Sequence, residues 1–146
     1  MRIKENALRF VFIVLVNLFI FANVFFVNIV FHEIGHYMAA DYFGLEPEME
    51  LELENIESVA FGLESVELAS TSFIDNGNKE ELAVIAAMGP FANLILSVFF
   101  LFLFVYARKK RFISEMGLIG AVVSIGSFIM NILPFRGIDG SYVWLS

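Results

Sequence analysis

Three long stretches of the chain contain no charged residue and no histidine. They cover residues 10–31, 82–107 and 116–135, and each has at least 20 residues. A helix needs about 20 residues to cross the hydrocarbon core of a bilayer, and there it satisfies its own backbone hydrogen bonds. The pattern predicts an all-α membrane protein with three transmembrane helices. The alternative is a buried bundle of a soluble protein, which three such runs would leave with little polar surface.

The residues at the ends of these runs set the expected helix boundaries. The first helix should continue past residue 31, because no proline occurs between residues 10 and 42 and Gly44 is a suitable C-terminal stop. The first run is too long for the apolar region of a signal peptide, so we expect it to remain in the mature protein. We predict one membrane-embedded domain over residues 1–146, with helices at about 8–43, 81–107 and 112–134, a β or loop segment at 44–80, and an Asp-Gly segment at 135–146.

The segment between the first two predicted helices is rich in acidic residues. Residues 49–54 alternate strictly between apolar and acidic, which predicts a strand with Met49, Leu51 and Leu53 on one face. A second strand-like run follows at residues 59–68. We therefore expect a small β element at the membrane surface after the first helix. A solvated acidic loop is the alternative, because runs of charge are often only that.

Composition supports a lipid environment and excludes several kinds of site. Hydrophobic residues make up 59% of the chain, and 18 residues are phenylalanine. There is no cysteine, which excludes disulfides and thiolate metal sites. The net charge of -7 argues against nucleic-acid binding.

The sequence His32-Glu33-Ile34-Gly35-His36 is an HExxH motif, and it contains both histidines of the chain. On a helix, positions i and i+4 share a face, so the two imidazoles can bind one zinc ion. Glu33 is then placed to act as a general base on water. The alternative is a set of polar residues that reach the interface from a helix end.

A catalytic zinc ion usually has three protein ligands, so a third ligand is needed. No further histidine and no cysteine is present, which leaves a carboxylate. Asp139 is the best candidate, because Pro134 ends or kinks the preceding helix and Gly137 and Gly140 let the backbone approach a metal. The alternative is an ordinary Asp-Gly turn.

Two asparagines lie within the apolar helices. Asn93 follows Gly89-Pro90 and places an amide at membrane depth, where it needs a partner. It could donate to a substrate carbonyl or a developing oxyanion, or it could join two helices. Asn28 precedes His32 by four residues and could support a ligand or simply pack.

Three motifs occur in a fixed order on the three successive apolar segments. They are His32-Glu33-x-x-His36, Gly89-Pro90-x-x-Asn93, and Asn131-x-x-Pro134 leading to Asp139-Gly140. In this the chain resembles the site-2 protease family of intramembrane zinc metalloproteases, over about residues 27–140. The resemblance implies that His32, His36 and Asp139 bind zinc, that Glu33 is the catalytic acid and base, and that Asn93 helps to hold the substrate or the tetrahedral intermediate. It also implies a membrane-associated β element after the HExxH helix.

The predicted function is hydrolysis of peptide bonds within or near the transmembrane segments of membrane proteins. A substrate helix must unwind first, and the strand that carries Leu51 and Leu53 could bind the unwound segment by β-augmentation. The expected partners are a membrane protein substrate and the lipid bilayer, and the expected location is the cell membrane as a multi-pass protein. The oligomeric state is left open.

Other functions remain possible at this point. A membrane-anchored protease of soluble substrates would place its HExxH outside the apolar region. A non-catalytic metal-binding or scaffolding membrane protein would not need Glu33. The orientation in the membrane is also open. The basic residues around the first helix and at 108–111 favour a cytoplasmic location of the N-terminus and of residues 108–111. The family resemblance favours the reverse, with the segment after the HExxH motif in the cytoplasm.

Overall fold

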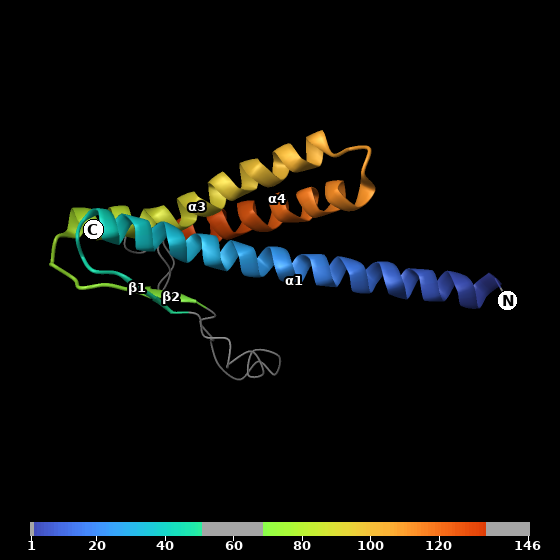
Figure 1. Ribbon diagram of the computed structural model, residues 1–146, viewed down its shortest axis with the longest axis horizontal. Coiled ribbons are helices and arrows are strands. Elements are labelled where there is room, and N and C mark those ends of the chain that lie inside the picture. The colour runs from blue at the N-terminus through green and yellow to red at the C-terminus, as the bar shows by residue number, and fades with distance from the viewer. Residues whose placement is uncertain (1, 51–68, 134–146) are drawn as a thin grey trace.

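The computed structural model describes residues 2–50 and 69–133 of the chain, and within these residues it shows three long helices and a two-stranded antiparallel sheet (Figure 1). Each of the three helices is long and apolar enough to cross a membrane, which confirms the predicted fold class. The elements in chain order are α1 (Arg2–Tyr42), β1 (Glu48–Glu50), β2 (Ser70–Ser72), α3 (Lys79–Tyr106) and α4 (Arg111–Ile132).

Large apolar side chains cover the outer faces of all three helices. Phe19 of α1, Phe102 of α3 and Val122 of α4 are 69%, 63% and 63% exposed. A large apolar surface of this kind promotes association in water, whereas lipid chains solvate it. The outer surface of the bundle is therefore suited to contact the hydrocarbon of a bilayer.

The helices meet in an apolar core along the middle of the bundle. Ile20 and Val24 of α1 pack there with Leu96 and Phe100 of α3 and with Ala121 of α4. Figure 1 shows α3 and α4 as neighbours joined by a short turn, with α1 lying along this hairpin. The core fixes the position of α1, which carries the HExxH motif, against both other helices.

A buried polar contact also joins α1 to α4. The Nδ2 group of Asn28 donates to the Oγ atom of Ser124 at 2.9 Å and to the carbonyl oxygen of Val24 at 3.2 Å. Asn28 is 1% exposed and Ser124 is fully buried. In hydrocarbon an amide needs such a partner. Of the two roles considered for Asn28, the structure therefore shows packing between helices.

Capping hydrogen bonds explain where α1 ends and where α3 begins. At the end of α1, Gly44 adopts a φ of +71°, its N–H donates to the carbonyl of Asp41, and the N–H of Leu45 donates to the carbonyl of Ala40. This pair of hydrogen bonds is a Schellman motif, which requires a residue in the left-handed region. The expected stop at Gly44 is thus confirmed. At the start of α3, the side chain of Asn78 accepts a hydrogen bond from the N–H of Glu80.

The predicted β element after the first helix is present as two strands within the segment 44–80. Of the expected strand over residues 49–54, the described residues Met49 and Glu50 belong to β1, which pairs with β2 and has Met49 opposite Thr71. All three residues of β1 are exposed. The rest of the predicted strand, including Leu51 and Leu53, and the run at 59–68 lie outside the described residues.

Charge is distributed unevenly between the two ends of the bundle. Arg9 and the basic residues 108–111 lie toward the end that carries the N-terminus and the α3–α4 turn (Figure 1). The sheet and the C-terminal end of α1 lie toward the other end, together with the acidic residues Asp41, Glu46, Glu48 and Glu50. The HExxH residues lie in the C-terminal part of α1, toward the acidic end.

Candidate metal centre

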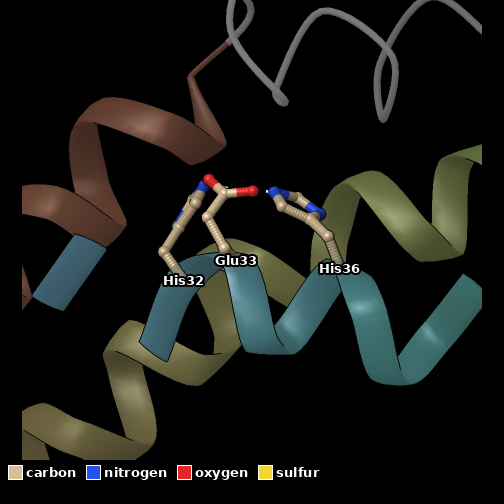
Figure 2. A group of neighbouring side chains, drawn as sticks. All are labelled: His32, Glu33 and His36. Carbon is tan, nitrogen blue, oxygen red and sulfur yellow. Dashed lines mark hydrogen bonds between the residues drawn. The ribbon is translucent and has the colours of Figure 1, made fainter. Parts of the chain in front are cut away.

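The three HExxH side chains converge on one face of α1. Figure 2 shows His32, Glu33 and His36 projecting from α1 to the same side. One ligand atom from each residue lies within 4.8 Å of the others. The i, i+4 spacing of the histidines on a continuous helix produces this arrangement. The group could therefore hold a metal ion.

The spacing of the two imidazoles fits a tetrahedral ion. The Nε2 atoms of His32 and His36 are 3.1 Å apart. Two nitrogen ligands bound to zinc at 2.0–2.1 Å in tetrahedral geometry would be about 3.3 Å apart. The two ring nitrogens are therefore already at the separation that one shared cation requires.

His36 is oriented by the backbone of α3. Its Nδ1 atom is 2.8 Å from the carbonyl oxygen of Ile85, and the side chain is only 8% exposed. A carbonyl can only accept a hydrogen bond, so this contact places the ring proton on Nδ1 and leaves Nε2 with a lone pair. Metal-binding histidines are commonly held by such a hydrogen bond from the other ring nitrogen.

Asn93 of α3 contacts the other imidazole. Its Nδ2 atom is 3.1 Å from Nδ1 of His32, the residue is 1% exposed, and its Oδ1 atom is buried without a hydrogen-bond partner among the described residues. If His32 binds a metal through Nε2, its proton sits on Nδ1, and an amide oxygen is the suitable acceptor. Rotation of the amide by half a turn would supply that oxygen. The buried amide is thus matched to a metal-bound His32.

Two glycines allow α1 and α3 to approach closely at this point. A Cβ atom on Gly89 would lie 2.3 Å from Nε2 of His36 and 2.9 Å from Cε1 of His32. A Cβ atom on Gly35 would lie 2.3 Å from the carbonyl oxygen of Met88. The imidazoles therefore rest directly on the backbone of α3 at Gly89. The absence of a side chain at these two positions allows this close packing.

Glu33 has a partner that the sequence did not suggest. The Oγ1 atom of Thr71, in β2, donates to Oε2 of Glu33 at 2.9 Å and lies 3.1 Å from the carbonyl oxygen of Glu33. The two residues are 38 positions apart. Ser-Thr-Ser carries no motif, so only the docking of β2 against α1 reveals the contact.

The site opens into a cleft of about 520 Å³. Both histidines and Glu33 form one wall of this cleft. The cleft is large enough for several residues of an extended peptide, and its rim contains polar and apolar groups from β2 and α3. The other residues that line it are Ala69, Ser70, Thr71, Ser72, Phe73, Asp75, Leu82, Ile85 and Ala86.

The predicted site residues are only partly within the described part of the chain. The structure brings His32, Glu33, His36 and Asn93 together. Asp139, the predicted third ligand, and Leu51 and Leu53, the predicted substrate contacts, lie outside the described residues. Their roles stay predictions.

Comparison with known proteins adds a family assignment. The model of a family described as peptidase family M50 matches residues 20–118, more than half of the chain. The matched region includes the HExxH motif and Asn93. Searches of curated proteins and of solved structures found no match.

Proposed function

This chain belongs to peptidase family M50, and from that premise we propose that it is an intramembrane zinc metalloprotease. It would hydrolyse peptide bonds within or near the transmembrane segments of membrane protein substrates. The observation that carries the proposal is the 3.1 Å separation of the His32 and His36 Nε2 atoms, with the Glu33 carboxylate beside them in an open cleft. A site of this kind inside an apolar bundle favours a membrane substrate.

We propose zinc as the metal, with His32, His36 and Asp139 as its protein ligands. Neutral imidazole and carboxylate are the donors of many catalytic zinc sites. α4 ends at Ile132, beside the HExxH helix in Figure 2, and Asp139 follows seven residues later. Seven residues of extended chain can span up to about 23 Å, which would allow the Asp139 carboxylate to approach the two imidazoles from the end of α4. When bound, zinc would act as a Lewis acid toward the scissile carbonyl and would make water a stronger nucleophile at neutral pH.

Glu33 is proposed to move the proton during hydrolysis. Its carboxylate would take a proton from the attacking water and return it to the leaving amine. Because a carboxylate oxygen of Glu33 lies within 4.8 Å of a ring nitrogen of each histidine, it faces the same volume of the cleft as the proposed metal ligands (Figure 2). The reaction would proceed without a covalent intermediate on the protein.

Asn93 is proposed to contribute to substrate binding as well as to the site itself. An amide carries two N–H groups. With the amide oxygen accepting from the Nδ1–H group of His32, these N–H groups can donate to a substrate carbonyl or to the tetrahedral intermediate. This role is proposed on the resemblance and on the 3.1 Å contact that places the amide beside the site.

The substrate segment is proposed to bind as an extended strand along the edge of the sheet. Among the described residues β1 pairs only with β2, so its outer edge can accept another strand. Leu51 and Leu53, which follow β1 in the alternating sequence, would then contact substrate side chains. Leu51→Pro removes a backbone N–H donor from the segment that follows β1. Wild-type cleavage of a membrane substrate by Leu51→Pro would exclude the strand from the mechanism.

The environment proposed for this reaction is the lipid bilayer of the cell membrane. The three apolar helices make the chain a multi-pass membrane protein. The expected partner is therefore a second membrane protein that presents a transmembrane helix. No nucleic acid is expected to bind.

The proposed function is tested by comparing Glu33→Gln with a matched control. The control is Glu115→Gln, which makes the same change at a half-buried residue near the basic end, in an ion pair with Arg111 at the helix surface. Each purified protein is assayed for zinc content and for cleavage of fluorescent single-span helical peptides in detergent micelles. We expect Glu33→Gln to keep its zinc and lose cleavage, while Glu115→Gln keeps both. A wild-type protein that binds zinc and cleaves none of the peptides would instead support a non-catalytic metal-binding or scaffolding protein.

A further inference from the structure

The side chain of Thr71 binds two parts of the same glutamate. Its hydroxyl donates to Oε2 of Glu33 at 2.9 Å and is 3.1 Å from the main-chain carbonyl oxygen of Glu33. A hydroxyl has one proton, so the two oxygens share it. The hydroxyl therefore links the carboxylate to the backbone of the helix turn from which it projects.

The alternation of side chains along the β2 region explains why Thr71 faces α1. Ala69 is 7% exposed and Phe73 packs on the cluster of Ala39, Ala40, Leu45 and Ile85. In an extended segment, residues two apart lie on one face, so Thr71 lies on the same side as Ala69 and Phe73. Ser72, on the opposite face, is exposed. The apolar neighbours thus direct the hydroxyl at the catalytic helix.

Backbone contacts hold β2 in this position. Thr71 is opposite Met49 in the antiparallel register, and the N–H of Ile74 donates to the carbonyl of Leu45 at 3.0 Å. Leu45 belongs to the cap that ends α1. The strand is therefore tied to the HExxH helix both beside Glu33 and at the helix end.

The carboxylate of Glu33 needs such a restraint. Glutamate has three side-chain torsions, and a half-buried one at the wall of an open cleft can adopt several rotamers. Proton transfer requires the carboxylate within hydrogen-bond reach of the water it acts on. A fixed donor to one carboxylate oxygen limits the rotamers without blocking the other oxygen.

We propose that Thr71 is a positioning residue that holds Glu33 in the orientation required for proton transfer. This inference rests on the proposed function, because Glu33 is the proton carrier only in a protease. It further implies that β2, at the rim of the cleft, and Glu33, the proton carrier, act together. Docking of β2 is then a condition for turnover and not for metal binding.

The test uses three substitutions that separate the hydroxyl from the shape of the side chain. Thr71→Val keeps the shape and removes the donor, Thr71→Ala removes the donor without the risk of overpacking, and Thr71→Ser keeps the donor. The loss of a hydrogen bond to a charged group is expected to lower a rate that depends on it by on the order of 10-fold. We expect kcat to fall about 10-fold in Thr71→Val and Thr71→Ala, with KM within about twofold of wild type and with zinc content unchanged. Thr71→Ser should restore kcat to within about twofold of wild type.

The outcomes distinguish this inference from the proposed function. If the wild-type protein shows no zinc-dependent cleavage, the proposed function fails. If the wild type cleaves and both donor-free variants turn over at the wild-type rate, only the role of Thr71 is refuted. Loss of zinc, or a rise in KM at constant kcat, would also refute it, because either result would show that Thr71 supports the fold of the site or the substrate and not Glu33.

Discussion

The contact between Gly89 and the two imidazoles predicts a large effect from a single methyl group. In Gly89→Ala the new Cβ atom would lie 2.3 Å from Nε2 of His36, whereas ordinary contact begins at about 3.4 Å. The ring must therefore move by about 1.1 Å, the difference between these two distances. His36 is 8% exposed and its Nδ1 atom contacts the carbonyl oxygen of Ile85. The ring therefore cannot move far and still share a cation with His32.

A displacement of this size exceeds what a metal site tolerates. Ligand distances in zinc sites vary by about 0.2 Å, and a misplacement of about 1 Å typically costs about 100-fold in the function it supports. We therefore expect Gly89→Ala to weaken zinc binding roughly 100-fold and to abolish cleavage at low zinc. Zinc affinity is measured in detergent by competition with a chromophoric chelator, and circular dichroism reports the helix content of each variant.

Gly126→Ala is the matched control. It makes the same change in a helix, but a Cβ atom on Gly126 would meet nothing within 4 Å. Alanine has a higher helix propensity than glycine, so this variant should be at least as stable as wild type and should bind zinc normally. A folded Gly89→Ala protein that binds zinc as tightly as Gly126→Ala would refute the placement of the imidazoles on the α3 backbone.

Two further predictions concern the buried amide and the orientation of the chain. Asn93→Leu should weaken zinc binding by about 10- to 100-fold, because it removes the acceptor for His32. Asn93→Asp keeps an oxygen at this position and should bind zinc within about 10-fold of wild type. Equal zinc affinities of the two variants in the same chelator assay would exclude the amide as a partner of His32. The positive-inside rule predicts that the end of the bundle with residues 108–111 faces the cytoplasm. Because the chain has no cysteine, Lys109→Cys and Asn76→Cys can be labelled one at a time in intact cells with a membrane-impermeant maleimide. Labelling of Asn76→Cys alone would support the orientation given by this rule, and labelling of Lys109→Cys alone would support the reverse orientation, which the family resemblance favours.

The helices could be predicted because their signal is local and long. Runs of 20 or more uncharged residues specify a membrane helix whatever surrounds them. The stop at Gly44 is equally local, because the Schellman motif depends on one residue in the left-handed region. The proximity of the HExxH residues could be predicted for the same reason, because the i, i+4 spacing places both histidines on one face of a single helix.

The contacts between elements could not be predicted in this way. The pairing of β1 with Ser70–Ser72 depends on the packing of Phe73 against the cluster at the end of α1, and three small polar residues carry no strand pattern of their own. The position of Asn93 beside His32 depends on how α3 is rotated against α1, which the close approach at Gly89 determines. Sequence spacing indicates which residues share a helix face, but it does not indicate which residues of other elements pack against that face.

The metal content of the purified chain tests the central claim most directly. We predict about one zinc ion per chain in the wild-type protein, and less than about a tenth of that in His36→Ala and in Asp139→Ala after dialysis against a weak chelator. Circular dichroism should show the same helix content in all three proteins. Wild-type zinc content in folded His36→Ala, or a wild-type protein that takes up no zinc, would contradict the assignment of this site.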